Sequence, residues 1–176
     1  SEYARAPELN LAALDLNKLI SQVADLYPAH HQQPKIRLDL DSSLPEVSLD
    51  AVRMRQVLHN LIRNALEALE GFENPEVSIS TRQDITDDGH WAEITIHDNG
   101  PGIPANKREE IFEPYVTSKD KGTGLGLAIV KKLVEEHGGK IHIDSDTGDG
   151  TCVRIRLPLQ VVHKHSGGSR LRRKSA

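Results

Sequence analysis

Polar side chains recur along one face of the longest helical pattern in the sequence. Gln56, Asn60, Asn64 and Glu67 stand at positions i, i+4, i+8 and i+11, so a helix places them in one stripe beside its apolar face. Asparagine disfavours a helix interior, because its side chain competes for backbone hydrogen bonds. The stripe is therefore either a solvated face or a set of amide oxygens, which are hard ligands of the kind that suits Mg²⁺.

A glycine-rich turn follows one of the predicted strands directly. It covers Asp98–Ile103, with the sequence Asp-Asn-Gly-Pro-Gly-Ile. Gly100 and Gly102 permit a tight turn and a close approach of the backbone to a ligand. The Asp98 carboxylate at the strand end is suited to accept a hydrogen bond from an exocyclic amine such as that of adenine. The pattern by itself also fits a plain turn.

A second glycine-rich segment opens the last predicted helix. Residues 122–127 read Gly-Thr-Gly-Leu-Gly-Leu, and backbone N–H groups at a helix N-terminus form an anion site. The segment differs from a dinucleotide-binding fingerprint, because the long loop precedes it in place of a strand. It also lacks the Gly-Lys-Ser/Thr of a Walker loop.

The elements that must position these residues follow from hydrophobic periodicity. Helices are predicted over residues 17–27, 50–71 and 124–137, with a short helical stretch near 106–111. Strands are predicted over residues 35–40, 77–80, 92–96, 140–145 and 151–157. Asp15 or Asn17 is the expected cap of the first helix and Asp50 that of the second. The order indicates an α/β sandwich, in which one mixed, mostly antiparallel sheet has helices packed on a single face.

The connecting segments carry further expectations. Asp87-Asp88-Gly89 joins two predicted strands as a hairpin. Residues 1–17 read as a helix end followed by a turn, and residues 43–46 as a loop. Residues 98–123 form a connection long enough to be a functional loop or lid.

Composition bounds the class of protein. The 176 residues suit one domain, and at 3% aromatics its core must be built from Leu, Ile, Val and Ala. No apolar run reaches the roughly 20 residues of a membrane span. The lone Cys152 excludes an internal disulfide and a cysteine-based zinc site. Residues 163–176 hold five basic residues and no acid, which leaves a formal charge of −9 on the remainder and opposes nucleic-acid binding.

The order and spacing of these motifs resemble the ATP-binding catalytic domain of bacterial sensor histidine kinases, in the GHKL superfamily. The asparagine box is residues 56–68, the glycine boxes are 98–103 and 122–127, and the phenylalanine box is 111–119. Gly150-Thr151 before the last strand also fits. The resemblance implies a Bergerat-type α/β sandwich over residues 17–160. Residues 1–16 would be the end of a dimerisation helix and a linker, whose first seven residues are similar to nitrogen-regulation-type kinases, and residues 161–176 a basic, disordered tail.

The resemblance also implies roles for individual residues. Asp98 would bind the adenine amine, Asn64 would ligate Mg²⁺, and Asn60 would lie near the phosphates as a second catalytic residue. Residues 104–123 would form an ATP lid anchored by Phe112, with Lys119 and Lys121 as candidate phosphate contacts. The nucleotide-binding set so implied is Asp98, Gly100, Gly102, Ile103, Phe112, Lys119, Gly122, Thr123, Gly124, Leu125, Gly126, Leu127 and Thr151.

One position favours phosphoryl transfer over hydrolysis. In hydrolytic members of the superfamily a glutamate activates water one turn before the metal asparagine, whereas Asn60 stands here and cannot accept a proton. None of the nine histidines has the expected phosphoacceptor context on a helix. His97 matches superficially but ends a strand, and His137 and His142 are expected to be structural. We therefore expect a protein histidine kinase domain that phosphorylates a separate dimerisation domain and acts on a response regulator indirectly.

Two other functions stay open at this point. The chain could be a nucleotide-responsive interaction module without phosphotransfer, or a serine kinase of the anti-sigma type. In each case ATP and Mg²⁺ are the expected ligands and nucleic acid is not an expected partner. We expect this fragment to be monomeric and cytoplasmic, with the full-length kinase dimeric and anchored at the inner membrane.

Overall fold

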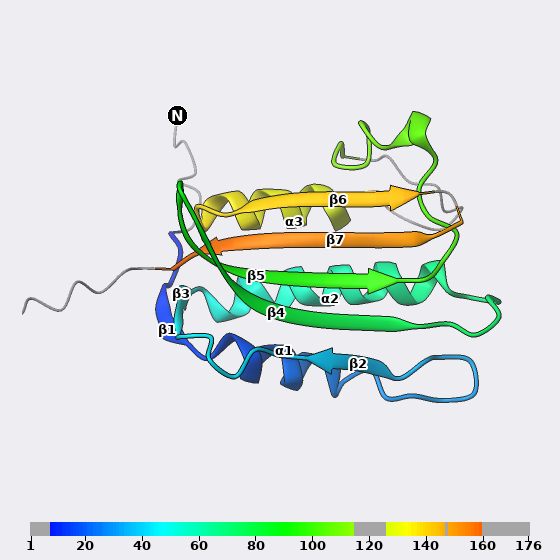
Figure 1. The fold of residues 1–176 in the computed structure, drawn as a ribbon, viewed down its shortest axis with the longest axis horizontal. Helices are drawn as coiled ribbons and strands as arrows, with labels where there is room; N and C mark the ends of the chain where they lie inside the picture. The colour runs from blue at the N-terminus through cyan, green and yellow to red at the C-terminus, as the bar shows by residue number, and fades with distance from the viewer. Residues whose placement is uncertain (1–7, 115–125, 147, 160–176) are drawn as a thin grey trace, which may run out of the picture.

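A five-stranded sheet covered by helices on one face forms the body of the protein (Figure 1). The computed structural model describes residues 8–114, 126–146 and 148–159. In sheet order the strands are β2 (Ile36–Asp39), β4 (Val77–Thr86), β5 (Gly89–Asp98), β7 (Gly150–Pro158) and β6 (Lys140–Asp146). Only β2 and β4 pair in parallel in this sheet. The helices are α1 (Leu16–Ala24), α2 (Ala51–Ala68) and α3 (Gly126–Glu136). The expected sandwich is confirmed.

Strand alternation decides which face of the sheet is covered. Successive side chains of a strand point to opposite faces, so each strand contributes one row to the core and one to solvent. The inward row of β5 and β7 is apolar and buried, and it packs against the apolar face of α2. The buried residues of these three elements include Ala92, Ile94, Ile96, Val153, Ile155, Leu157, Leu58, Leu61 and Ile62. Among the described residues, no helix combines the length and apolarity needed to cross a bilayer.

Asp50 caps α2 as predicted and joins three parts of the chain. Its Oδ1 accepts a hydrogen bond from Arg53 N–H at 3.1 Å, and its Oδ2 accepts one from Asn10 N–H at 3.0 Å. The Asn10 and Arg53 donors lower the pKa of the Asp50 carboxyl. Its own N–H donates to His137 Nε2 at 3.1 Å, while His137 Nδ1 lies 2.7 Å from Leu133 O and must donate to it. The structural role expected of His137 is therefore confirmed.

Two short strands were missed by the sequence analysis. β1 (Ala12–Leu14) pairs antiparallel with β3 (Val47–Leu49), in the regions predicted as a turn and a loop boundary. Three-residue strands are too short to display alternation, and their pairing depends on a partner far away in the chain. The pair attaches the N-terminal segment to the start of α2.

Element boundaries differ in four other places. α1 begins at Leu16 with Asp15 as its cap, and α2 ends at Ala68, before Gly71. The predicted β4–β5 hairpin is confirmed and is longer than expected, since both strands extend to the turn at Asp87–Asp88. Near residues 106–111 the chain forms a 3-10 helix, Ala105–Lys107, followed by turns, so the short helix predicted there is wrong in extent.

The hairpin provides a test of the core. Ile94 on β5 is fully buried, whereas Ile85 on β4 is 64% exposed. We expect Ile94→Ala to lower the free energy of unfolding by about 2–5 kcal/mol, because it removes buried methyl groups and leaves a cavity. Ile85→Ala is the matched control and should change it by less than about 0.5 kcal/mol. Chemical denaturation of both variants measures the difference, and equal losses would contradict the assignment of the covered face.

Candidate functional site

Three polar side chains form a row where the central strands end. Asp98 on β5 pairs with Thr151 on β7, and Thr151 pairs with Ser145 on β6. All three continue the inward rows of their strands, so they lie on the helix-covered side. Asp98 and Ser145 are 5% and 7% exposed. The structure therefore brings the predicted residues Asp98 and Thr151 together, and it adds Ser145.

Ser145 was missed by the sequence analysis. A signal for it exists, because Ile141 and Ile143 are the inward residues of the predicted strand and Ser145 is next in the same alternation. A polar residue at an inward position indicates either a strand end or a buried hydrogen bond. Ser145 meets both conditions, because it lies near the end of β6 and its hydroxyl donates a hydrogen bond to Gly150 O.

The first glycine segment folds back over Asp98. Asp98 Oδ1 accepts a hydrogen bond from Gly100 N–H at 3.0 Å. A β-carbon added to Gly100 would lie 2.9 Å from that oxygen and 3.3 Å from Ala68 O. Glycine at this position thus allows the turn to contact the C-terminal end of α2.

The same segment is attached on its other side to the β6–β7 turn. Gly102 has a φ of +77°, and a β-carbon on it would lie 2.2 Å from Asp146 O. Ile103 N–H donates to Ser145 Oγ at 2.7 Å. The backbone of residues 100–103 is therefore held between α2 and the β6–β7 turn, and both glycines permit this close packing within the protein.

The asparagine stripe of α2 runs along the border of the core. Asn60, Asn64 and Glu67 are half-buried, and Gln56 is exposed. A β-carbon on Gly126, the first residue of α3, would lie 3.9 Å from Asn64 Nδ2. Since Ala68 stands about one turn after Asn64, the last two turns of α2 lie against Gly100 and beside Gly126.

The described part of the predicted lid is attached to the domain at two points. Arg108 Nη2 lies 3.3 Å from Asp146 Oδ1, and Arg108 Nε donates to Ile103 O at 3.3 Å. Farther along, Lys131 Nζ on α3 lies 5.5 Å from the centroid of the Phe112 ring, within reach of a cation–π contact. Leu127 is half-buried and packs against the core. Lys119, Lys121, Gly122, Thr123, Gly124 and Leu125 lie outside the described residues.

A contact that was not predicted fixes the turn of α2 that carries Asn60. Tyr27, just beyond α1, places its hydroxyl 2.7 Å from His59 Nδ1, with the ring centroids 5.6 Å apart. Burial raises the pKa of the Tyr27 hydroxyl, which keeps it protonated. The residue before Asn60 is thus tied to the chain segment that follows α1.

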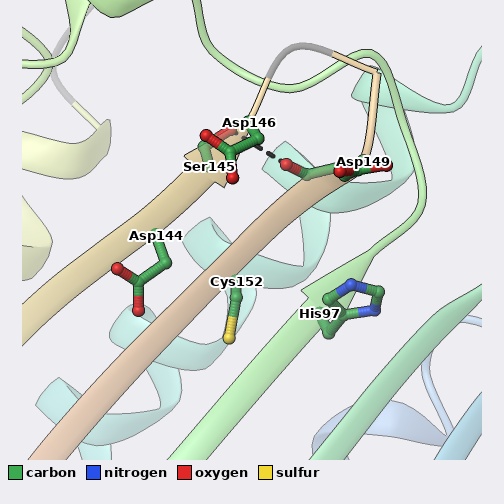
Figure 2. Close-up of a pocket in the computed structure, with 7 residues that line it drawn as sticks. His97, Asp144, Ser145, Asp146, Asp149 and Cys152 are labelled. Carbon is green, nitrogen blue, oxygen red and sulfur yellow. Dashed lines mark hydrogen bonds between the residues drawn. The ribbon is translucent and has the colours of Figure 1, made fainter.

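The opposite face of the sheet holds a small pocket that extends to the β6–β7 turn (Figure 2). Its volume is about 130 Å³, and its lining includes a second cross-strand row, His97, Cys152 and Asp144, which lies on β5, β7 and β6. Burial raises the pKa of the Cys152 thiol, so the thiol stays protonated. Within the described part of the chain, no group of three or more His, Cys, Asp or Glu residues is arranged to hold a metal ion. The pocket also reaches Ser145 at the end of β6, so it adjoins the row of Asp98, Thr151 and Ser145 at that residue.

Comparison with known proteins agrees with this geometry. Residues 49–161 match the family model HATPase_c, described as histidine kinase-, DNA gyrase B- and HSP90-like ATPase. The chain belongs to this family. It is also similar to the sensor histidine kinase ZraS of Escherichia coli K12, with 36% identity over 169 residues that cover 95% of this chain and 35% of the relative. The chain spans about a third of the length of the curated relatives that match it first.

Solved structures give the same assignment. Full-length ShkA in complex with AMPPNP aligns at a TM-score of 0.75 and 34% identity, over 88% of this chain and 32% of ShkA. The catalytic domain of histidine kinase ThkA, in a nucleotide-free form, aligns at 0.70 and 32% identity, over 85% of this chain and 96% of that domain. This HATPase_c chain is the ATP-binding catalytic domain of a sensor histidine kinase of two-component signalling.

A comparison of Gly102 with Gly148 separates two costs of replacing a glycine, namely the strain of a positive φ and the steric clash of a β-carbon. Gly102 and Gly148 both have positive φ, but a β-carbon on Gly148 would meet nothing within 4 Å. We expect Gly148→Ala to lower stability by about 1–2 kcal/mol through the left-handed backbone alone. Gly102→Ala should lower it further and also weaken nucleotide binding, because its β-carbon would displace the loop from Asp146. Thermal unfolding and calorimetric ADP titration measure both effects; the same loss in both variants would argue against a close approach at Gly102.

Proposed function

We propose that this domain binds Mg²⁺-ATP and transfers the γ-phosphoryl group to a histidine on a separate dimerisation domain. The observation that supports it most directly is the double contact of α2. The helix meets Gly100 through Ala68 and lies beside Gly126 through Asn64. A nucleotide whose base lies at Asp98 would then extend its phosphates along the asparagine stripe toward the start of α3.

The base would be recognised at the strand ends. Asp98 accepts a hydrogen bond from the exocyclic amine of adenine, which gives a charge-assisted bond in a buried site. Thr151, on the neighbouring strand, would contact the same base together with the backbone of Gly100, Gly102 and Ile103. The loop glycines let the plane of the base approach the main chain.

The phosphates would lie between α2 and the start of α3. Asn64 offers an amide oxygen to Mg²⁺, an ion that keeps several waters and is bound through few protein ligands together with substrate phosphates. One amide beside Gly126 fits that chemistry, and a carboxylate cage is not required. When bound, the ion neutralises charge on the β- and γ-phosphates. Asn60 would contact the phosphates one turn earlier, and residues 122–126 would offer backbone N–H groups to them.

The transfer itself needs positioning more than acid–base chemistry. A ring nitrogen of the acceptor histidine attacks the γ-phosphorus, the bond to the bridging oxygen breaks, and ADP leaves. The imidazole proton passes to solvent or to a base of the partner. Asn60 cannot take a proton from water, so hydrolysis is slow and the phosphoryl group is kept for the histidine. Phe112 would anchor the lid of residues 104–123 over the nucleotide, with Lys119 and Lys121 near its phosphates.

The place of this domain in a longer kinase follows from the same assignment. Residues 17–160 would be the catalytic domain, residues 1–16 the end of the dimerisation helix with its linker, and residues 161–176 a basic tail. The full-length protein would be a dimer at the inner membrane, with this domain in the cytoplasm. A response regulator would receive the phosphoryl group from the dimerisation domain.

Replacement of Asp98 tests the nucleotide site. Asp98→Asn should weaken ATP and ADP binding by about 1.5–3 kcal/mol, because the amide loses the charge-assisted bond and can present its NH₂ to the adenine amine. Calorimetry with Mg²⁺ present measures the affinity. Asp144→Asn, on the open face of β6, is the control and should bind like the wild type. Near-wild-type affinity in Asp98→Asn would remove the adenine assignment.

Replacement of Asn64 tests the transfer. The isolated chain should not acquire stable phosphate from labelled ATP, and addition of the kinase's own dimerisation domain should allow acid-labile phosphorylation. Asn64→Ala should lower that rate by orders of magnitude, since the metal contributes several kcal/mol to the transition state. Gln22→Ala, which removes an exposed amide from α1, serves as the control. Phosphate on a histidine of the isolated chain, or acid-stable phosphate on serine, would contradict the proposed reaction.

A further inference from the structure

We propose that Ser145 sets the base specificity of the site, because its hydroxyl fixes the direction of the Thr151 hydroxyl so that the pocket selects a 6-amino purine over a 6-oxo purine. This inference rests on the proposed function, in which the purine base lies against Asp98 and Thr151. Ser145 acts through Thr151, so it is a positioning residue.

The Ser145 hydroxyl has three partners in the structure. It accepts a hydrogen bond from Ile103 N–H at 2.7 Å and donates one to Gly150 O at 2.9 Å. Thr151 Oγ1 lies 3.1 Å away. The backbone of the first glycine loop encloses the group, since a β-carbon on Gly102 would lie 3.1 Å from Ser145 Oγ. The side chain is thus held in place by contacts on several sides.

The number of hydroxyl protons determines the direction of the hydrogen bond between Ser145 and Thr151. A hydroxyl donates one hydrogen bond and accepts two. The only hydroxyl proton of Ser145 is donated to the carbonyl oxygen of Gly150. Gly150 is buried, so leaving this oxygen without a donor would destabilise the folded state. The hydrogen bond between the two hydroxyls must therefore run from Thr151 to Ser145. Ser145 then uses all of its capacity, with two bonds accepted and one donated.

The direction of this hydrogen bond determines whether Thr151 can donate to a bound base or only accept from it. With its proton committed to Ser145, the Thr151 hydroxyl presents lone pairs to the pocket. Asp98, its cross-strand neighbour, also only accepts when it is ionised. An amine at position 6 of a purine has two N–H groups for such acceptors, whereas a carbonyl oxygen there would face lone pairs. A site built around specific hydrogen bonds rejects an analogue that lacks the complementary group.

The test compares ADP with IDP, which differ at this end of the base. Calorimetry with Mg²⁺ should show a strong preference of the wild type for ADP. In Ser145→Ala the Thr151 hydroxyl can rotate and donate to the 6-oxo group, so we expect the affinity ratio of ADP to IDP to fall by about tenfold, equal to about 1.4 kcal/mol. Ser145→Thr keeps the hydroxyl and should restore the wild-type ratio.

A matched control separates specificity from loss of stability. Thr81 on β4 is also a buried hydroxyl, which donates to Asn17 Oδ1 at 2.8 Å and accepts from Asp41 N–H at 3.0 Å. Thr81→Val should lower the thermal midpoint and leave the ratio of ADP to IDP unchanged. Should Ser145→Ala fail to fold, Ser145→Cys keeps the volume with only a weak donor and acceptor, and the ratio should fall in that variant as well.

The outcomes distinguish this inference from the function on which it rests. An unchanged ratio in folded Ser145→Ala or Ser145→Cys overturns the role of Ser145, while ADP binding stays sensitive to Asp98→Asn. If Asp98→Asn leaves ADP binding unaltered, the base lies elsewhere and the proposed site itself is wrong. A ratio that falls equally in Thr81→Val would mean that lost stability, and not the hydroxyl direction, explains the change.

Discussion

The site takes its geometry from the packing of α2 across the inner face of the sheet. Its apolar residues Leu58, Leu61 and Ile62 are buried almost completely, which sets the rotation of the helix about its axis. That rotation leaves Asn60, Asn64 and Glu67 half-buried at the border of the core. The same helix contacts Gly100 and lies beside Gly126, so its packing places both of these glycines relative to Asn64.

The sheet contributes a second constraint through its alternation. At the same end of β5, β7 and β6, adjacent residues form two cross-strand rows on opposite faces. The inward row, Asp98, Thr151 and Ser145, is enclosed by the glycine loop. The outward face is covered by charges that pair with one another, such as Arg156 with Glu93 at 3.1 Å. The charged groups of the outward face thus compensate one another, while the inward row is available for recognition.

Several hydrogen bonds hold the asparagine helix in place from outside the site. Asp50 joins its first turn to Asn10 and to His137 at the end of α3, and Tyr27 bonds to His59 one residue before Asn60. These bonds connect the N-terminal segment, α1 and α3 to one helix. Phosphoryl transfer relies on positioned groups and charge neutralisation, and a helix restrained at both of these turns keeps Asn60 and Asn64 at a defined place.

Local patterns in the sequence are enough to predict most helices and strands and the residue types placed on them. The capped α2, the β4–β5 hairpin, the glycine turn after Asp98 and the family motifs all follow from patterns within short windows, where period and turn chemistry act directly. The β1–β3 pairing, the bond between Tyr27 and His59, and the contacts of Ser145 with Ile103, Gly150 and Thr151 depend on the tertiary structure. Those contacts join residues distant in the chain, and they exist only once strand register and helix packing are set, which no local pattern encodes.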